Sequence, residues 1–105
     1  MTTETIAGTS VEVDEEGFLV DPSVWTEEMA VPLAAEVGLE ALNEDHWTVI
    51  KFCRNDYFEK GESPTLRRVS VETGVPTKQL FELFPKKPAK KMSYVAGVPK
   101  PKGCV

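Results

Sequence analysis

Residues 43–61, NEDHWTVIKFCRNDYFEKG, form the clearest helical pattern of this 105-residue sequence. Its apolar side chains recur at spacings of three, three and four residues, at Trp47, Ile50, Cys53 and Tyr57. That period places them on one face of a helix. Asn43 suits the N-cap and Gly61 suits the C-terminal end. We therefore predict a long helix with this face turned inward, and we expect Cys53 to behave as a small buried hydrophobe.

The first turn of this helix contains His46, the one histidine of the sequence. Because the sequence does not place a Cys, Ser or Asp partner against its side chain, we expect a capping or surface residue rather than a catalytic base. Two cysteines and one histidine cannot supply the four ligands of a zinc site from a single chain. We expect no metal and no organic cofactor.

Two shorter helices should follow the long one. Ser63 would cap the first, Pro64 would occupy its first position, and Gly74 would end it. The second should begin at Thr77, and its apolar face would consist of Leu80, Phe81 and Phe84. The two helices with a glycine between them have the outline of a helix-turn-helix, in which Arg67, Arg68 and Lys78 would suit phosphate contacts. A DNA-binding regulator is therefore one alternative function.

The N-terminal part should contain a β-hairpin and a further helix. In SVEVDEEGFLV (residues 10–20), apolar residues alternate on either side of an acidic turn, which predicts strands near 10–13 and 17–20. We expect residues 1–9 to be loose. Thr26 is a suitable N-cap for a helix that stops near Gly38, and Pro32 should kink this helix or move its start.

The last 21 residues, PKKPAKKMSYVAGVPKPKGCV, have a different composition. They hold four prolines, two glycines and six lysines, which argues against a continuous helix or a core strand. We predict that residues 85–105 form a mobile C-terminal arm. Pro99 and Pro101 stiffen its end, and this lowers the entropy lost when the arm enters another protein.

Length and composition favour one small domain spanning residues 1–105. The expected fold is mainly α: a small orthogonal helical bundle with an N-terminal β-hairpin, a helix-turn-helix-like pair and the flexible arm. Neither a signal-peptide pattern nor an apolar run of about 18 residues occurs, so we expect a cytoplasmic protein without membrane contact. Fifteen of the 17 acidic residues precede Pro64 and nine of the 12 basic residues follow it, so the C-terminal half should offer a basic face to an acidic partner.

Cys104 is the penultimate residue and can contribute little to a core. Only a thiolate attacks sulfur, and a free cysteine is about 3% ionised at neutral pH. Lys100 and Lys102 favour the anion, and the adjacent terminal carboxylate opposes it. Activation therefore requires a docking site, for which Arg67 is the intramolecular candidate. A thiol that ionises only where it docks suits a carrier.

The C-terminal block LFELFPKKPAKKMSYVAGVPKPKGCV resembles the C-terminus of the DsrC/TusE family, whose pattern is LFP.GPAK…AG.PKP..C with a penultimate cysteine. Earlier stretches agree in order, including VDEEGFLVDPSVW and DHWTVIKFCRNDYFEKGESPTLRRVSVETG. The resemblance implies a mostly α-helical fold with a hairpin and an arm. It also implies that Cys104 accepts a persulfide and passes it on, with Arg67 and Lys100 near the sulfur. The lysines of PKK replace a glycine that is usual in the family.

One difference bears on the branch of the family. Members that serve dissimilatory sulfite reductase have a second cysteine eleven residues before the last one, and the sequence has Ser93 there. The resemblance is therefore to the single-cysteine, TusE-like branch and implies a sulfur-relay protein, in tRNA 2-thiouridine formation or in sulfur oxidation. The implied partners are persulfide donor and acceptor proteins. The alternatives are a sulfite reductase gamma-subunit-like protein and the DNA-binding regulator.

Overall fold

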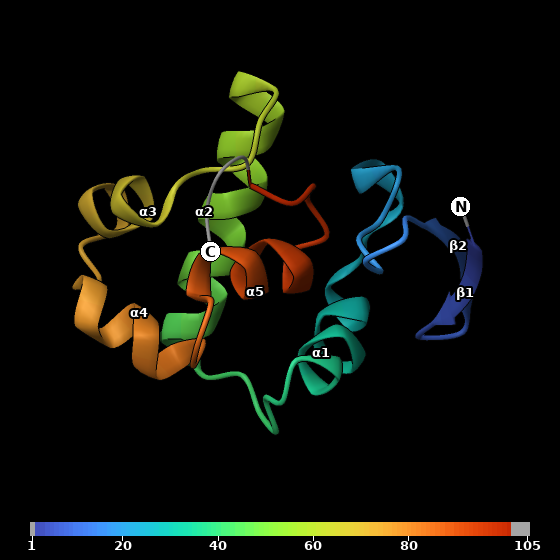
Figure 1. The fold of residues 1–105 in the computed structure, drawn as a ribbon, viewed down its shortest axis with the longest axis horizontal. Helices are drawn as coiled ribbons and strands as arrows, with labels where there is room; N and C mark the ends of the chain where they lie inside the picture. The colour runs from blue at the N-terminus through green and yellow to red at the C-terminus, as the bar shows by residue number, and fades with distance from the viewer. Residues whose placement is uncertain (1, 102–105) are drawn as a thin grey trace.

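Helix α2 (Glu44–Lys60) runs through the middle of the protein in the computed structural model, which describes residues 2–101 (Figure 1). The prediction for both of its ends is confirmed. The Asn43 side chain accepts a hydrogen bond from the His46 amide, and His46 Nδ1 accepts one from the Asn43 amide, each 3.0 Å long. Gly61 closes the helix with φ 82°, a left-handed value that glycine adopts without strain. His46 is thus the capping residue that the sequence predicts.

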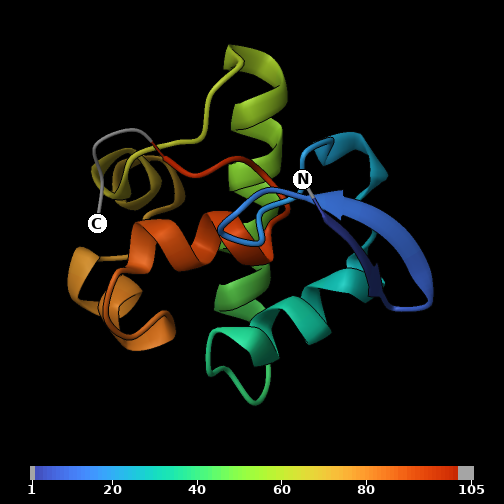
Figure 2. The same cartoon turned by 45° about the vertical axis from the view of Figure 1, so that its right-hand side comes forward.

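Within residues 2–101, two strands, one 3-10 helix and four further α-helices surround α2: β1 (Thr2–Ile6), β2 (Thr9–Val13), η1 (Pro22–Val24), α1 (Glu27–Glu36), α3 (Leu66–Thr73), α4 (Thr77–Leu83) and α5 (Pro88–Val95). Helix α5 crosses in front of α2 in both ribbon views, with α3 and α4 on one side and α1 on the other (Figure 2). The hairpin of β1 and β2 lies beyond α1. The predicted mainly α fold with a hairpin is confirmed.

Two apolar clusters hold these elements together. The larger one lies between α2, α4 and α5 and includes the fully buried Ile50, Cys53 and Met92. The smaller one joins β2 to α1 and includes Met29 and Leu33. Trp25 packs against both clusters, so it connects the hairpin side of the protein to α5.

Helix α5 corrects the prediction that no continuous helix forms in residues 85–105. Its eight residues, Pro88–Val95, belong to the core, and Ala96 and Val98 beyond it are also fully buried. Proline is tolerated at the first position of a helix, where its missing amide would have no partner. Pro88 occupies that position, and the next prolines come only after the helix has ended. The number of prolines is therefore misleading here, because their positions leave a proline-free stretch of nearly two helical turns, residues 89–95.

The hairpin is present, but its strands differ from those predicted. Strand β1 pairs antiparallel with β2 in the register Thr2↔Val13 to Ile6↔Thr9, so residues 2–6 are not loose. Ala7 and Gly8 form the connection with φ of 50° and 81°, the positive values that tight two-residue hairpin loops require. The stretch expected as the second strand contributes only an isolated bridge between Val13 and Leu19.

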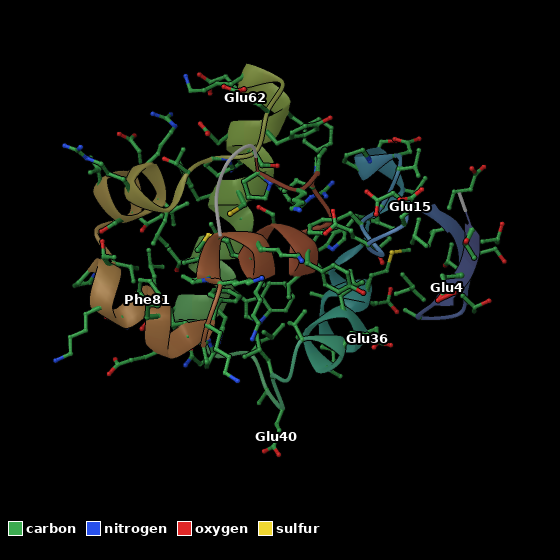
Figure 3. All side chains as sticks on the ribbon, in the orientation of Figure 1. Glu4, Glu15, Glu36, Glu40, Glu62 and Phe81 are labelled. Carbon is green, nitrogen blue, oxygen red and sulfur yellow. The ribbon has the colours of Figure 1, made fainter. Side chains whose placement is uncertain are left out.

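Three local predictions in the helices are also corrected. Helix α3 is capped by Thr65, whose side chain accepts a hydrogen bond from the Arg68 amide, and Ser63 is left for another contact. Phe81 of α4 is 48% exposed (Figure 3), and Leu83 is buried in its place. Of the two effects predicted for Pro32, a moved helix start does not occur, because α1 begins at Glu27 and contains Pro32.

Ser93 provides a test of the α5 packing. It is fully buried, and its hydroxyl has no hydrogen-bond partner among residues 2–101. A buried unsatisfied hydroxyl costs about 1–3 kcal/mol, and alanine is also the better helix former. We expect Ser93→Ala to raise the free energy of unfolding by about 1 kcal/mol and Tm by roughly 5 °C. Differential scanning calorimetry would measure both quantities.

The control is Ser70→Ala, which changes a partly exposed serine of α3. It gains the same helix propensity without removing a buried hydroxyl, so its effect should be about 0.5 kcal/mol or less. A lower Tm for Ser93→Ala than for the wild type would mean that the hydroxyl has a stabilising partner.

Candidate functional site

The chain leaves α5 through residues 96–101, which we call the strap, and the strap turns back toward α2 (Figure 1). Trp25 Nε1 donates a 3.0 Å hydrogen bond to the Val95 carbonyl just before it. Gly97 has φ 70° and lies against the Trp25 ring. The Val98 amide donates to the Ser93 carbonyl at 3.1 Å, and Val98 is fully buried. The first half of the strap is therefore part of the folded body.

Arg54 of α2 is the main side-chain anchor of the strap. Its guanidinium donates to the Ala96 carbonyl at 2.9 Å and to the Pro22 carbonyl at 3.0 Å. The same group lies 4.3 Å from the centre of the Trp25 ring and 5.2 Å from that of Phe58, where the cation meets the faces of both rings. Partial burial lowers the pKa of Arg54, but arginine remains charged at any physiological pH. Sequence reasoning missed this residue, because its partners lie 32 and 42 positions away.

The second half of the strap is held by polar contacts. The Ser63 hydroxyl donates to the Pro99 carbonyl, and this is the role that the serine has instead of a helix cap. Lys100 Nζ lies 3.1 Å from Glu16 Oε1, which also contacts Lys90 Nζ at 3.3 Å. The hydrogen bond from Lys100, and after it the one from Lys90, lowers the pKa of Glu16 below its ordinary value. Both contacts therefore persist at neutral pH, where this carboxylate is ionised.

The described chain ends at a buried proline, Pro101. Beside it lies a cleft of about 240 Å³ between the strap and the turn from α2 to α3, lined by Tyr57, Gly61, Glu62, Ser63, Thr65, Pro99, Lys100 and Pro101. The strap thus delivers the chain to one defined corner of the protein, at the C-terminal end of α2.

Four residues were predicted for the site. Cys104 and Lys102 lie outside the described residues. Lys100 is exposed and contacts Glu16. Arg67 is the second residue of α3 and is exposed, and no hydrogen bond or ion pair joins it to the strap within residues 2–101. Arg67 and Lys100 are therefore not joined by a polar contact among these residues.

Arg68, predicted as a phosphate contact in the DNA-binding alternative, is engaged inside the protein. Its Nε and Nη2 atoms donate to both carboxylate oxygens of the buried Asp56 over 2.8–3.1 Å. The hydrogen bond to Asp56 is the main reason that the pKa of Arg68 is raised. Removing Arg68 would leave the buried Asp56 carboxylate uncompensated, so this pair fixes α3 on α2.

Cys53 is the one cysteine within residues 2–101, and it is fully buried. Burial, and after it the charge of Asp56, raise the pKa of its thiol far above the ordinary value. Because the thiolate is the reactive form, the prediction of an inert core cysteine is supported. Within the same described residues, no three His, Cys, Asp or Glu side chains are grouped as a metal site.

We therefore expect native protein treated with iodoacetamide under reducing conditions to accept one carboxamidomethyl group, on Cys104, and to accept two after denaturation. Burial of the Cys53 thiol is the physical reason. Peptide mass spectrometry after digestion assigns the label. Modification of Cys53 at a rate near that of a free thiol in the native protein would contradict the packing of α2 against α5.

Comparison with known proteins places the chain in a family. A family model described as "DsrC like protein" matches residues 5–105. The chain belongs to this DsrC-like family. It is 39% identical over 106 residues to "Sulfurtransferase TusE" of Pectobacterium atrosepticum, an alignment that covers 93% of this chain and 95% of the relative.

Two further members of the DsrC-like family are similar over nearly their whole lengths. The gamma subunit of dissimilatory-type sulfite reductase from Nitratidesulfovibrio vulgaris is 39% identical over 101 residues, 96% of each chain. The solution structure of Allochromatium vinosum DsrC superposes with a TM-score of 0.84 at 36% identity, covering 98% of this chain and 97% of that one. None of the helices within residues 2–101 is both long enough and apolar enough to span a membrane.

Proposed function

We propose that this chain is a sulfur-relay protein that carries sulfane sulfur on Cys104. The observation that carries the proposal is the anchored strap, whose buried end, Pro101, lies three residues before Cys104. An extended chain spans about 3.3 Å per residue, so the sulfur can travel roughly 10 Å from Pro101 while the strap stays docked. Membership of the DsrC-like family supports the same function.

The relay chemistry is a transfer between two thiols. The Cys104 thiolate attacks the outer sulfur of a donor persulfide, a new sulfur–sulfur bond forms at Cys104, the donor's own sulfur–sulfur bond breaks, and the donor leaves as a thiolate. An acceptor thiolate then attacks the outer sulfur on Cys104 in the same way. Each step exchanges one sulfur–sulfur bond for another, so no external oxidant or reductant is needed.

The basic residues near the end of the chain have supporting roles in this proposal. Lys102 and Lys100 favour the thiolate by their positive charge. Lys100 keeps its positive charge while it contacts Glu16, and this contact is exposed and of low energy. Arg67 lies exposed on α3 and would meet the sulfur only when the chain beyond Pro101 folds back over the α2–α3 corner.

The proposed partners are a persulfide donor and an acceptor protein, in the cytoplasm where thiols stay reduced. The relative named "Sulfurtransferase TusE" supports transfer of sulfur. The TusE-like resemblance of the sequence implies tRNA 2-thiouridine formation as the destination of the sulfur, with sulfur oxidation as the other route. A sulfite reductase gamma-subunit-like role is the second candidate, supported by the relative from N. vulgaris. Ser93 limits that role to binding, because a buried hydroxyl in α5 cannot form a disulfide with Cys104.

Two measurements test the proposal. After incubation of the wild-type protein with a protein-bound persulfide, intact mass spectrometry should find a gain of about 32 Da, the mass of one sulfur atom. Deletion of the gene should then deplete 2-thiouridine in total tRNA hydrolysates if the sulfur goes to tRNA. Failure of the protein to accept sulfur would contradict the proposed relay function. Loading with unchanged 2-thiouridine would direct the sulfur to the oxidation route.

A further inference from the structure

A second cleft, of about 450 Å³, lies away from the strap's end, between α1, α5 and the turn before Phe18. This volume falls within the roughly 300–1,000 Å³ of small-molecule sites. Its lining residues are charged or aromatic with one aliphatic exception: Glu16, Phe18, Glu36, Val37, Lys87, Lys90, Lys91 and Tyr94. The relay chemistry described above does not use this cleft.

The charges of the cleft are arranged in two groups. Lys87, Lys90 and Lys91 come from the start of α5, and Glu36 comes from the C-terminal end of α1 (Figure 3 labels Glu36). Lys90 is paired with Glu16. Lys91 gives one of its three hydrogens to the Pro85 carbonyl, so two donors remain. Among residues 2–101, neither Lys87 nor Glu36 takes part in an ion pair.

Aromatic rings form the apolar part of the cleft. Tyr94 meets Phe18 edge to face, with ring centres 5.3 Å apart. Burial, and after it the negative charge of Glu36, raise the pKa of Tyr94, so this phenol is a neutral hydrogen-bond donor at neutral pH. Sulfur atoms make favourable contacts with the edges of such rings.

This lining selects the charge type of the ligand. Once Lys90 and Glu16 neutralise each other, two cations and one carboxylate remain, which matches a small molecule with two carboxylates and one ammonium. A polyanion such as nucleic acid fits poorly, because Glu36 lies in the cleft and the whole chain has a net charge of −5. A ligand that has a sulfur atom between its charged ends would also contact the rings of Phe18 and Tyr94.

We propose that this cleft binds a small zwitterionic thiol peptide of the glutathione type, with its carboxylates at Lys87 and Lys91 and its ammonium at Glu36. Glu16 connects the cleft to the strap, since the same carboxylate oxygen contacts Lys90 in the cleft and Lys100 on the strap. A bound thiol peptide is therefore one side chain away from the segment that leads to Cys104. As its persulfide, such a peptide would be a low-molecular-weight sulfur donor: the Cys104 thiolate attacks the outer sulfur, the sulfur–sulfur bond of the peptide breaks, and the peptide leaves as a thiolate. This role rests on the proposed function.

The test is a titration of the full-length, ¹⁵N-labelled Cys104→Ser protein with reduced glutathione, followed by ¹H–¹⁵N correlation spectra at constant ionic strength. Removing Cys104 prevents a mixed disulfide, and it makes the binding result independent of whether the relay loads sulfur. We expect saturable shifts at Gly17, Lys87, Lys91 and Tyr94, with Kd on the order of 1 mM.

Lys87→Glu should weaken this binding by about tenfold, because it exchanges an attraction for a repulsion. A glutamate at the start of α5 favours the helix dipole, so this variant should fold. Lys78→Glu is the matched control. It reverses an exposed lysine of α4 outside the cleft and should leave Kd unchanged.

Three outcomes would overturn the proposal. The first is an unchanged Kd in Lys87→Glu, and the second is a set of shifts that map outside the cleft. The third is equal affinity for sodium sulfate at the same ionic strength, which would mean that the lysines attract any anion and that Glu36 recognises no ammonium group.

Discussion

A Cys104→Ser variant should accept no sulfur from a persulfide donor, so its intact mass should stay unchanged where the wild type gains about 32 Da. A serine hydroxyl stays protonated at neutral pH, whereas about 3% of an unperturbed cysteine is thiolate. The alcohol also lacks the nucleophilicity toward sulfur that exchange requires. Because the reaction depends on that one atom, the expected effect is a complete loss rather than a reduced rate.

The control for this variant uses the other thiol. Cys53→Ala should load sulfur like the wild type, since Cys53 is buried and its thiol stays protonated. This variant should instead lose about 1 kcal/mol of its free energy of unfolding, because the substitution leaves a small cavity between α2 and α5. A gain of one sulfur atom in Cys104→Ser, mapped to Cys53 by digestion, would show that the core opens to the donor and would transfer the proposed role to that residue.

The parts of the fold that the sequence predicts well are those encoded by neighbouring residues. The two ends of α2 follow from Asn43 and His46 at its start and from Gly61 at its end. Each of these residues acts on backbone groups within one turn of its own position. The burial of Cys53 follows from the period of its helix. Such signals are local, so a single sequence contains them in full.

The errors arise where position within an element matters more than composition. Residues 85–105 are rich in proline, yet Pro88 stands at the first position of α5, where the missing amide costs no helical hydrogen bond. Ser63 and Thr65 are both good caps, and the choice between them depends on the distant Pro99 carbonyl that takes the Ser63 hydroxyl. The sequence does not specify which of two equivalent local signals is used.

The candidate site was predicted only in part, for a related reason. The thiol is visible in the sequence, but its support comes from contacts between distant residues: Arg54 with Ala96, Ser63 with Pro99, and Glu16 with Lys100, separated by 42, 36 and 84 positions. A charge count predicts that the acidic and basic halves attract each other. It does not identify Glu16 as the residue that contacts both Lys90 and Lys100.

Gly97→Ala should be the most destabilising single-methyl change at this site. Gly97 ends α5 with φ 70°, where a residue with a side chain pays about 1 kcal/mol. A Cβ at this position would overlap the Trp25 ring and come within 2.9 Å of its Cβ atom. Trp25 cannot move away easily, because its indole donates to the Val95 carbonyl and stacks on Arg54. Strain and overpacking together should cost about 3 kcal/mol and lower Tm by more than about 10 °C.

Gly74→Ala separates the two causes. Gly74 ends α3 with φ 81°, but a Cβ there would have no atom within 4 Å. That variant has the backbone strain alone, so its free energy of unfolding should fall by about 1 kcal/mol when urea denaturation is used to compare both variants with the wild type. Equal losses in the two variants would mean that Trp25 yields to the methyl group. In that case the strap is not held rigidly at its start, and the reach of Cys104 would no longer be limited to the three residues after Pro101.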